Sequence, residues 1–154
     1  SLVDIAIAGE VTLGGEVLEV RGKGWFDREW SSQLLKTGQK GWDWFALHLN
    51  SGDKLMAFRL RDESGSFLSG TWLPAKGAPV PLGADELNLK ELERREGVPV
   101  RWQLSVPDYH LAIELSAPPG DYLNSGLYPY WESPVSVSGS HQGEGYMELT
   151  GYAD

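Results

Sequence analysis

Trp25-Phe26-Asp27-Arg28-Glu29-Trp30-Ser31-Ser32-Gln33 and, after a polar break, Gly41-Trp42-Asp43-Trp44-Phe45 hold the densest group of aromatic side chains in this chain. Four of the seven tryptophans and three closely spaced carboxylates lie here. Each aromatic side chain can bury roughly 150–250 Å², and acids among them must be paired, hydrogen-bonded or protonated. The stretch therefore predicts either a pocket that contains acidic groups or a core whose polar atoms are all satisfied.

Alternation of side chains predicts that both parts of this stretch are extended strands. Along the predicted strand 16–32, Trp25, Asp27 and Glu29 share one face. Along the next predicted strand, 42–50, the two tryptophans lie opposite the phenylalanine and the leucines. The acids and the aromatic rings are thus expected on defined faces of a sheet.

Outward from this stretch, apolar and polar residues alternate in further short runs. Gly14-Gly15 is a two-residue hairpin signal, segment 84–97 favours a strand over a short helix, and 74–83 and 118–128 are predicted to be loops. The remaining predicted strands are 2–12, 55–61, 67–73, 98–106, 109–115, 130–138 and 145–152. About nine or ten strands joined mostly by hairpins predict an antiparallel all-β domain, either a barrel or a sandwich.

Composition limits the classes of partner. The 154 residues fit one domain, 1–154, with a sizeable core. A net charge of −9 argues against nucleic acid and against an anionic membrane surface. The chain has no cysteine, and no apolar run approaches the roughly 20 residues of a membrane span.

Other kinds of site find little support in the sequence. His48, His110 and His141 lie far apart and lack the spacing of zinc ligands. No Gly-x-Ser-x-Gly elbow and no glycine-rich phosphate loop before a helix is present. We therefore expect neither a metal nor a cofactor.

Several motifs in order along the chain resemble one protein family. These motifs are Trp25-Phe26-Asp27-Arg28-Glu29-Trp30-Ser31-Ser32, Gly41-Trp42-Asp43-Trp44-Phe45, Leu55-Met56 with Arg59-Leu60-Arg61, Tyr130-Trp131-Glu132, and Gly145-Tyr146-Met147-Glu148-Leu149-Thr150-Gly151-Tyr152. Together they resemble the carotenoid 1,2-hydratase (hydroxyneurosporene synthase) superfamily, most closely its AttH-like branch of secreted hydrolases.

The resemblance implies a fold, a domain arrangement and a compartment. Family members contain two lipocalin-like β-barrels, and these motifs belong to the C-terminal half. The chain thus resembles the second domain of such a protein. The expected partner is an N-terminal lipocalin-like domain. Export is frequent in the family, which implies an extracytoplasmic or periplasmic setting.

The resemblance also implies candidate catalytic residues. Hydratases of the family carry Tyr-His-Asp where this chain has Trp25-Phe26-Asp27, and the aspartate is taken as the acid. Adding water to an alkene needs a carboxylic acid that is still protonated near neutral pH and an aromatic wall that stabilises a cation. Asp27 is then the acid and Glu29 its partner.

The candidate ligand-binding residues are aromatic side chains and one further acid. Trp25, Trp42 and Trp44 are candidates for the aromatic wall, and Tyr130-Trp131-Glu132 for the mouth of the barrel. Two structural alternatives remain open. The Asp-Arg-Glu run pairs with arginines such as Arg59 or Arg61, or the tryptophans are only core.

Two functions follow from these observations. The first is a binding module that takes up a hydrophobic small molecule of the lipid or isoprenoid type and performs no chemistry. The second is a hydratase or related cyclase acting on an isoprenoid alkene, with Asp27 as general acid. The first is favoured for this chain, because a site between two barrels would be incomplete here.

Overall fold

The computed structural model describes residues 1–28, 35–126 and 129–152. The chain divides into two compact units, Ser1–Leu34 and Leu35–Asp154. We call them the hairpin unit and the sheet unit. The described residues form strands and one short 3-10 helix, Pro107–Tyr109, and none of their helices is long and apolar enough to cross a bilayer.

The hairpin unit consists of two long antiparallel strands, β1 (Leu2–Leu13) and β2 (Glu16–Phe26). Gly14 and Gly15 form the turn with φ of 59° and 90°, the positive angles that a tight hairpin turn requires. The predicted second strand, 16–32, ends earlier than expected, since β2 stops at Phe26 and residues 27 and 28 are not part of it, while residues 29–32 lie outside the described residues.

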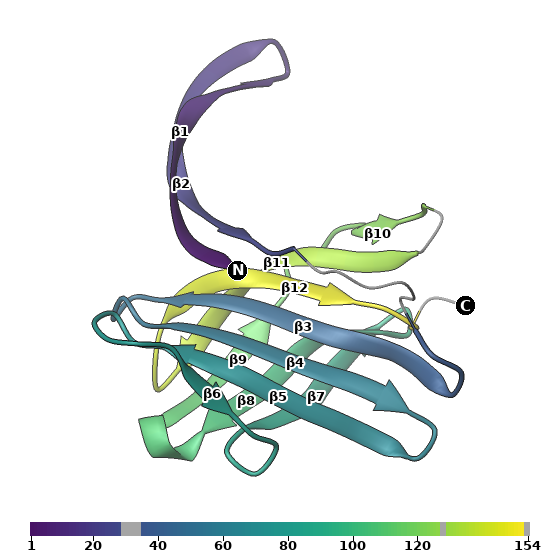
Figure 1. Ribbon diagram of the computed structural model, residues 1–154. Coiled ribbons are helices and arrows are strands. Elements are labelled where there is room, and N and C mark those ends of the chain that lie inside the picture. Colours follow the sequence, from purple (N-terminus) through teal and green to yellow (C-terminus); the bar gives the residue numbers. More distant parts are fainter. Residues whose placement is uncertain (29–34, 127–128, 153–154) are drawn as a thin grey trace. The chain divides into compact units, whose positions relative to one another are not determined.

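The sheet unit contains the other ten strands in one antiparallel sheet, which curls into a half-barrel (Figure 1). The order is β6-β5-β4-β3-β12-β11-β9-β8-β7, and β10 pairs with β11. The strands are β3 (Gln39–Leu49), β4 (Lys54–Asp62), β5 (Gly65–Leu73), β6 (Val80–Leu82), β7 (Asn88–Arg95), β8 (Val98–Val106), β9 (Leu111–Ser116), β10 (Leu123–Asn124), β11 (Tyr130–Gly139) and β12 (Gly143–Leu149). The prediction of an all-β antiparallel fold is confirmed.

The core lies on the inner face of the half-barrel. Phe45, Leu47 and Leu49 alternate inward along β3 and are almost completely buried. Phe45 meets Trp102 of β8 edge to face, with ring centroids 5.3 Å apart. Because β3 and β8 are not neighbours in the sheet, this contact crosses the interior and packs the two sides of the half-barrel together.

Most strand predictions hold, and the exceptions have local causes. Segment 84–97 contains β7, as the alternation indicated. The predicted loop 74–83 contains the short strand β6, which pairs with β5, and the predicted loop 118–128 contains β10. Both missed strands have only two or three residues, too few to show alternation.

Candidate functional site

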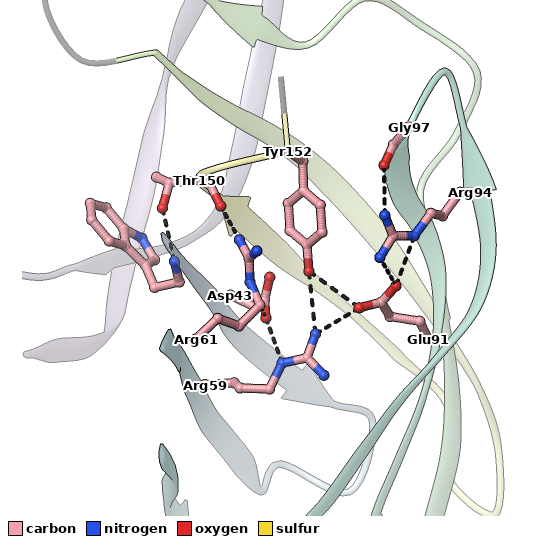
Figure 2. A network of polar contacts seen from close by, with 9 residues as sticks. Asp43, Arg59, Arg61, Glu91, Arg94, Gly97, Thr150 and Tyr152 are labelled. Atoms are coloured by element: carbon pink, nitrogen blue, oxygen red, sulfur yellow. Dashed lines mark hydrogen bonds and ion pairs between the residues drawn. The ribbon is translucent and has the colours of Figure 1, made fainter. Parts of the chain in front are cut away.

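A group of charged side chains gathers on the inner face of the half-barrel (Figure 2). We call Asp43, Arg59, Arg61, Glu91 and Tyr152 the inner polar cluster. Asp43 comes from β3, the two arginines from β4, Glu91 from β7, and Tyr152 follows β12. The fold brings these side chains together from four separate segments of the chain.

Strand alternation aims these side chains inward. Asp43 is two residues from the buried Phe45, and Arg59 is two residues from the buried Ala57. Asp43 and Arg59 are also direct partners in the register of β3 and β4. The same parity that builds the apolar core therefore carries a carboxylate and a guanidinium into the interior.

Asp43 is fully buried and is held by two arginines. Arg59 Nε donates to Asp43 Oδ2 at 2.6 Å, and Arg61 Nε lies 3.5 Å from the same oxygen. Arg61 also donates to the carbonyl of Thr150. The buried carboxylate is thus anchored to β4 and, through Arg61, to the segment that follows β12.

Glu91 extends the cluster across the interior. Arg59 Nη2 donates to Glu91 Oε1 at 2.9 Å, and the Tyr152 hydroxyl donates to the same oxygen at 3.3 Å. Arg94 holds the other oxygen, with Nε at 2.9 Å and Nη2 at 2.5 Å. Because β4 and β7 are not neighbours in the sheet, the hydrogen bond from Arg59 to Glu91 connects the two sides of the half-barrel across its interior.

Aromatic rings surround the guanidinium groups. The Cζ atom of Arg61 lies 3.8 Å from the centroid of the Tyr152 ring, and that of Arg59 lies 4.9 Å from the Trp102 ring. Trp102 is the direct register partner of Glu91 on β8. Such cation–π contacts gain strength where water is excluded.

The environment shifts the protonation of three members of the cluster. Burial raises the pKa of Asp43, although Arg59 and Arg61 act in the opposite direction. Burial alone would also raise the pKa of Glu91, but hydrogen bonds from Arg94 and Arg59 lower it overall. Burial and the negative charge of Asp43 raise the pKa of the Tyr152 phenol. Tyr152 therefore serves as a neutral hydrogen-bond donor.

Three buried polar atoms in and next to the inner polar cluster meet no hydrogen-bond criterion among the described residues. They are Asp43 Oδ1, Arg61 Nε and Trp102 Nε1, and the side chains of Asp43 and Trp102 have no exposed surface. The buried hydroxyl of Ser133 on β11 is in the same condition. An unsatisfied buried polar group costs about 1–3 kcal/mol, and at Asp43 the Tyr152 hydroxyl and the charge of Arg61 offset part of this cost.

The predicted catalytic residues belong to the hairpin unit. Asp27 follows β2, with 36% of its side chain exposed, and accepts a hydrogen bond from Trp25 Nε1 at 3.0 Å. The N-terminal ammonium of Ser1 lies 3.9 Å from the same carboxylate. Glu29 lies outside the described residues. The catalytic role of this pair stays a prediction.

Most of the predicted ligand-binding residues lie on the outer face of the half-barrel. Trp42 and Trp44 point away from the core along β3, and Trp42 Nε1 donates to Glu148 Oε1 at 2.7 Å. Tyr130 and Glu132 share the outer face on β11, while Trp131 points inward and is buried. Their part in ligand binding stays a prediction, and the fold does not bring all of them to one site.

The inner polar cluster was missed as a unit because each member looks ordinary in sequence. Arg59 and Arg61 form ion pairs with Asp43, and the predicted pairing with the Asp-Arg-Glu run stays a prediction, since Glu29 lies outside the described residues. One signal was present: Asp43 shares the parity of Phe45 on an otherwise apolar strand face. Glu91 carried no signal, since it stands in a run of charged residues.

No three histidine or acidic side chains among the described residues gather in a way that could hold a metal ion.

Comparison with known proteins identifies a family and a similar solved structure. The AttH-like family model matches residues 1–152. The chain is similar to the crystal structure of a protein assigned as AttH from Nitrosomonas europaea, with 28% identity, a TM-score of 0.83 and 98% of this chain covered. The chain spans 50% of that protein's length. A comparison with curated proteins gives no significant match.

Proposed function

The chain belongs to the AttH-like family, and we propose that its half-barrel binds a hydrophobic small molecule of the lipid or isoprenoid type. The observation that carries the proposal is the inner polar cluster, a charged group set into an apolar, aromatic interior. A few converging polar groups in apolar surroundings are typical of small-molecule sites. The polar end of the ligand would meet this cluster.

A gradient of exposure supports access to the cluster from solvent. The exposed fraction of the side chain falls from 51% for Arg94 to 26% for Glu91 and 16% for Arg59, and Asp43 is fully buried. Each residue in this series contacts the next. A ligand that displaces water from the outer members would therefore reach the buried ones.

Apolar side chains beside the cluster would hold the body of the ligand. Leu68 is the register partner of Arg59 on β5, and Leu89 precedes Glu91 by two residues on β7. Both are partly buried and pack against the core. Burying apolar ligand surface here would contribute about 25 cal/mol per Å².

The test is native mass spectrometry after the protein has been exposed to a mixed isoprenoid and lipid extract in heavy-oxygen water. We expect a bound species at its unaltered mass. Leu89→Glu should lower the bound fraction, while Leu92→Glu, at an exposed position on the same strand, should not. An equal loss in both variants, or no bound species in the wild type, would contradict the proposal.

The hydratase reaction is a second candidate, favoured by the hydrogen bond between Trp25 and Asp27. It requires Asp27 to donate a proton to an isoprenoid alkene, after which water adds to the cation. In the same experiment, a species heavier by one labelled water would support this reaction. Asp27→Asn should abolish the labelling, and Asp4→Asn, an exposed aspartate that pairs with Lys23, should retain it.

A partner domain and a compartment complete the proposal. An N-terminal lipocalin-like domain is the proposed partner, supported by the family match and by the greater length of the similar protein. The proposed setting is extracytoplasmic. Cell fractionation of the native source would test the compartment, and co-purification would test the partner.

A further inference from the structure

One face of the hairpin unit is apolar, and it is exposed. Residues that are direct partners in the register of β1 and β2 point to the same face, and successive residues alternate between the two faces. The apolar face, as we call it, carries the side chains of Ile5, Ile7, Val11, Leu13, Leu18 and Val20. The opposite face carries four charged side chains, those of Glu10, Glu19, Arg21 and Lys23. The exposed fraction is 50% for Ile7 and 62% for Leu13, and a contiguous exposed apolar surface marks an interaction site.

The hairpin unit gains little stability from burial within itself. Every residue from 4 to 19 is exposed, and a two-stranded hairpin is marginally stable at best in water. A second apolar sheet surface packed on the apolar face would bury these side chains and stabilise both strands. The shape and the charge of the hairpin unit indicate which surface fits.

The apolar face is complementary in shape to itself. In the half far from the turn, β2 contributes only glycines to this face, Gly22 and Gly24, and a Cβ atom added at Gly22 would meet nothing within 4 Å. In the half next to the turn, both strands contribute bulky side chains, such as Val11 and its partner Leu18. A twofold axis through the middle of the face, at Val20, would place the bulky half of each copy over the glycine half of the other. Leu18 would then lie over Gly22 of the second copy.

The charges of the hairpin unit favour the same arrangement. Residues 10–19, which include the turn, carry three glutamates and no lysine or arginine. The other halves of the two strands carry Arg21 and Lys23 against one acid, Asp4. Stacking two copies turn to base, where the base is the end far from the turn, brings the acidic half of each beside the basic half of the other. Stacking them turn to turn would instead gather the glutamates of both copies.

We propose that the apolar face of the hairpin unit binds the same face of a second copy of this chain, turn to base, around a twofold axis at Gly9 and Val20. An anionic membrane fits this face less well, because the chain has a net charge of −9. Each copy contributes few side chains compared with an obligate dimer, so the dimer should dissociate on dilution.

Sedimentation velocity of the full chain over a wide range of protein concentration tests the dimer. Val11→Lys places a charge in the apolar face, and it does so twice in a twofold dimer, so the dimer should dissociate at least about tenfold more readily. Thr12→Lys is the matched control, because Thr12 is the next residue on β1, is also exposed, and points to the opposite face. It introduces the same charge and should leave the dimer as stable as in the wild type.

Spin labels measure how the two copies are oriented. The chain has no cysteine, so Ala8→Cys and Thr12→Cys each provide a single labelling site, and both residues point away from the apolar face. With the axis at Gly9, the two labels at position 8 are offset by about 7 Å along the strands and those at position 12 by about 20 Å. Pulsed electron resonance should therefore give a clearly longer distance for Thr12→Cys than for Ala8→Cys.

Three results would overturn the proposal. A wild type that stays monomeric at every concentration would exclude a second copy and leave the apolar face to the partner domain proposed above. Equal weakening by Val11→Lys and Thr12→Lys would place the dimer contact elsewhere. Equal distances for the two labels would show that the copies stack turn to turn. None of these results bears on ligand binding by the half-barrel, which is tested separately.

Discussion

The Asp43 side chain lies in the interior and has no exposed surface. The folded state can hold this buried charge because Arg59 pairs with it. A buried ion pair recovers the desolvation cost only while both partners are present. The guanidinium of Arg59 donates hydrogen bonds to Asp43 and Glu91 and also lies over the ring of Trp102. At the residue scale, Arg59 is therefore the centre of the cluster.

Arg59→Met should destabilise the protein strongly. The variant leaves Asp43 buried with only the more distant Arg61, so we expect a loss of about 3–5 kcal/mol in the free energy of unfolding. Urea denaturation measures the change. Arg101→Met is the control, because Arg101 forms exposed pairs with Glu93 and Glu114, and removing such pairs should leave the free energy of unfolding almost unchanged. If both variants lowered the free energy of unfolding equally, the ion pair of Arg59 with Asp43 would contribute little to stability.

Glu91 should make stability fall in acid. Its pKa is lowered from the ordinary 4.5 in the folded state, so its contribution is present above pH 4.5 and is lost as pH falls through the folded pKa. Asp43, whose pKa is raised from 3.8, acts in the opposite direction, so its contribution is lost as pH rises through its folded pKa.

Glu91→Gln should therefore flatten the acid side of the stability profile. Urea midpoints measured from neutral pH down to about pH 3 report the change, because below pH 4.5 the wild type binds a proton more readily when unfolded. Glu93→Gln, an exposed position on the same strand, should keep the wild-type slope. An unchanged slope in Glu91→Gln would show that the ion pairs of Glu91 do not couple to folding.

At the element scale, the start of β3 is fixed by close backbone contact. Gly41 has φ of 143°, and a Cβ atom there would clash with the carbonyl oxygen of Thr150. Thr150 also bonds the backbone of Trp42 on both sides, through its N–H and its Oγ1. This contact holds the end of β12 against β3 and brings Tyr152 to the inner polar cluster.

Gly41→Ala should therefore destabilise the sheet unit far more than a glycine replacement usually does. Gly65→Ala is a closely matched control, since Gly65 has φ of 149° but open space around it. The control should cost about 1–3 kcal/mol from backbone strain alone, and Gly41→Ala should cost several kcal/mol more or prevent folding. Thermal unfolding followed by circular dichroism measures both. Similar midpoints would contradict the close contact.

At the scale of the whole molecule, the two units differ in what stabilises them. The sheet unit contains the core cluster, whereas the apolar side chains of the hairpin unit, such as Ile7 and Leu13, are exposed. A two-stranded hairpin is at best marginally stable in water. The prediction that residues 1–154 form one domain stays a prediction. It can be tested by measuring the stability of each unit alone.

Residues 35–154 produced alone should unfold in one cooperative transition, because the core residues lie within them. A peptide of residues 1–34 should show no stable strand signal by circular dichroism. The full chain, measured under the same conditions, is the reference. Loss of the cooperative transition in 35–154 would instead support a single folding domain over the full length.

The order of residues alone was enough to predict the all-β class, the positions of the longer strands and the Gly14-Gly15 turn. These features depend on alternation and turn chemistry, which act between neighbours in the chain. The inward direction of Asp43 could also have been read from its parity with Phe45.

Which charged groups meet depends on how the strands are arranged in space. Arg59 reaches Glu91 and Trp102 because the sheet curls and brings β4 opposite β7 and β8. Tyr152 joins them because Thr150 holds the end of the chain against β3. Such contacts depend on strand order and curvature, and local residue patterns contain neither.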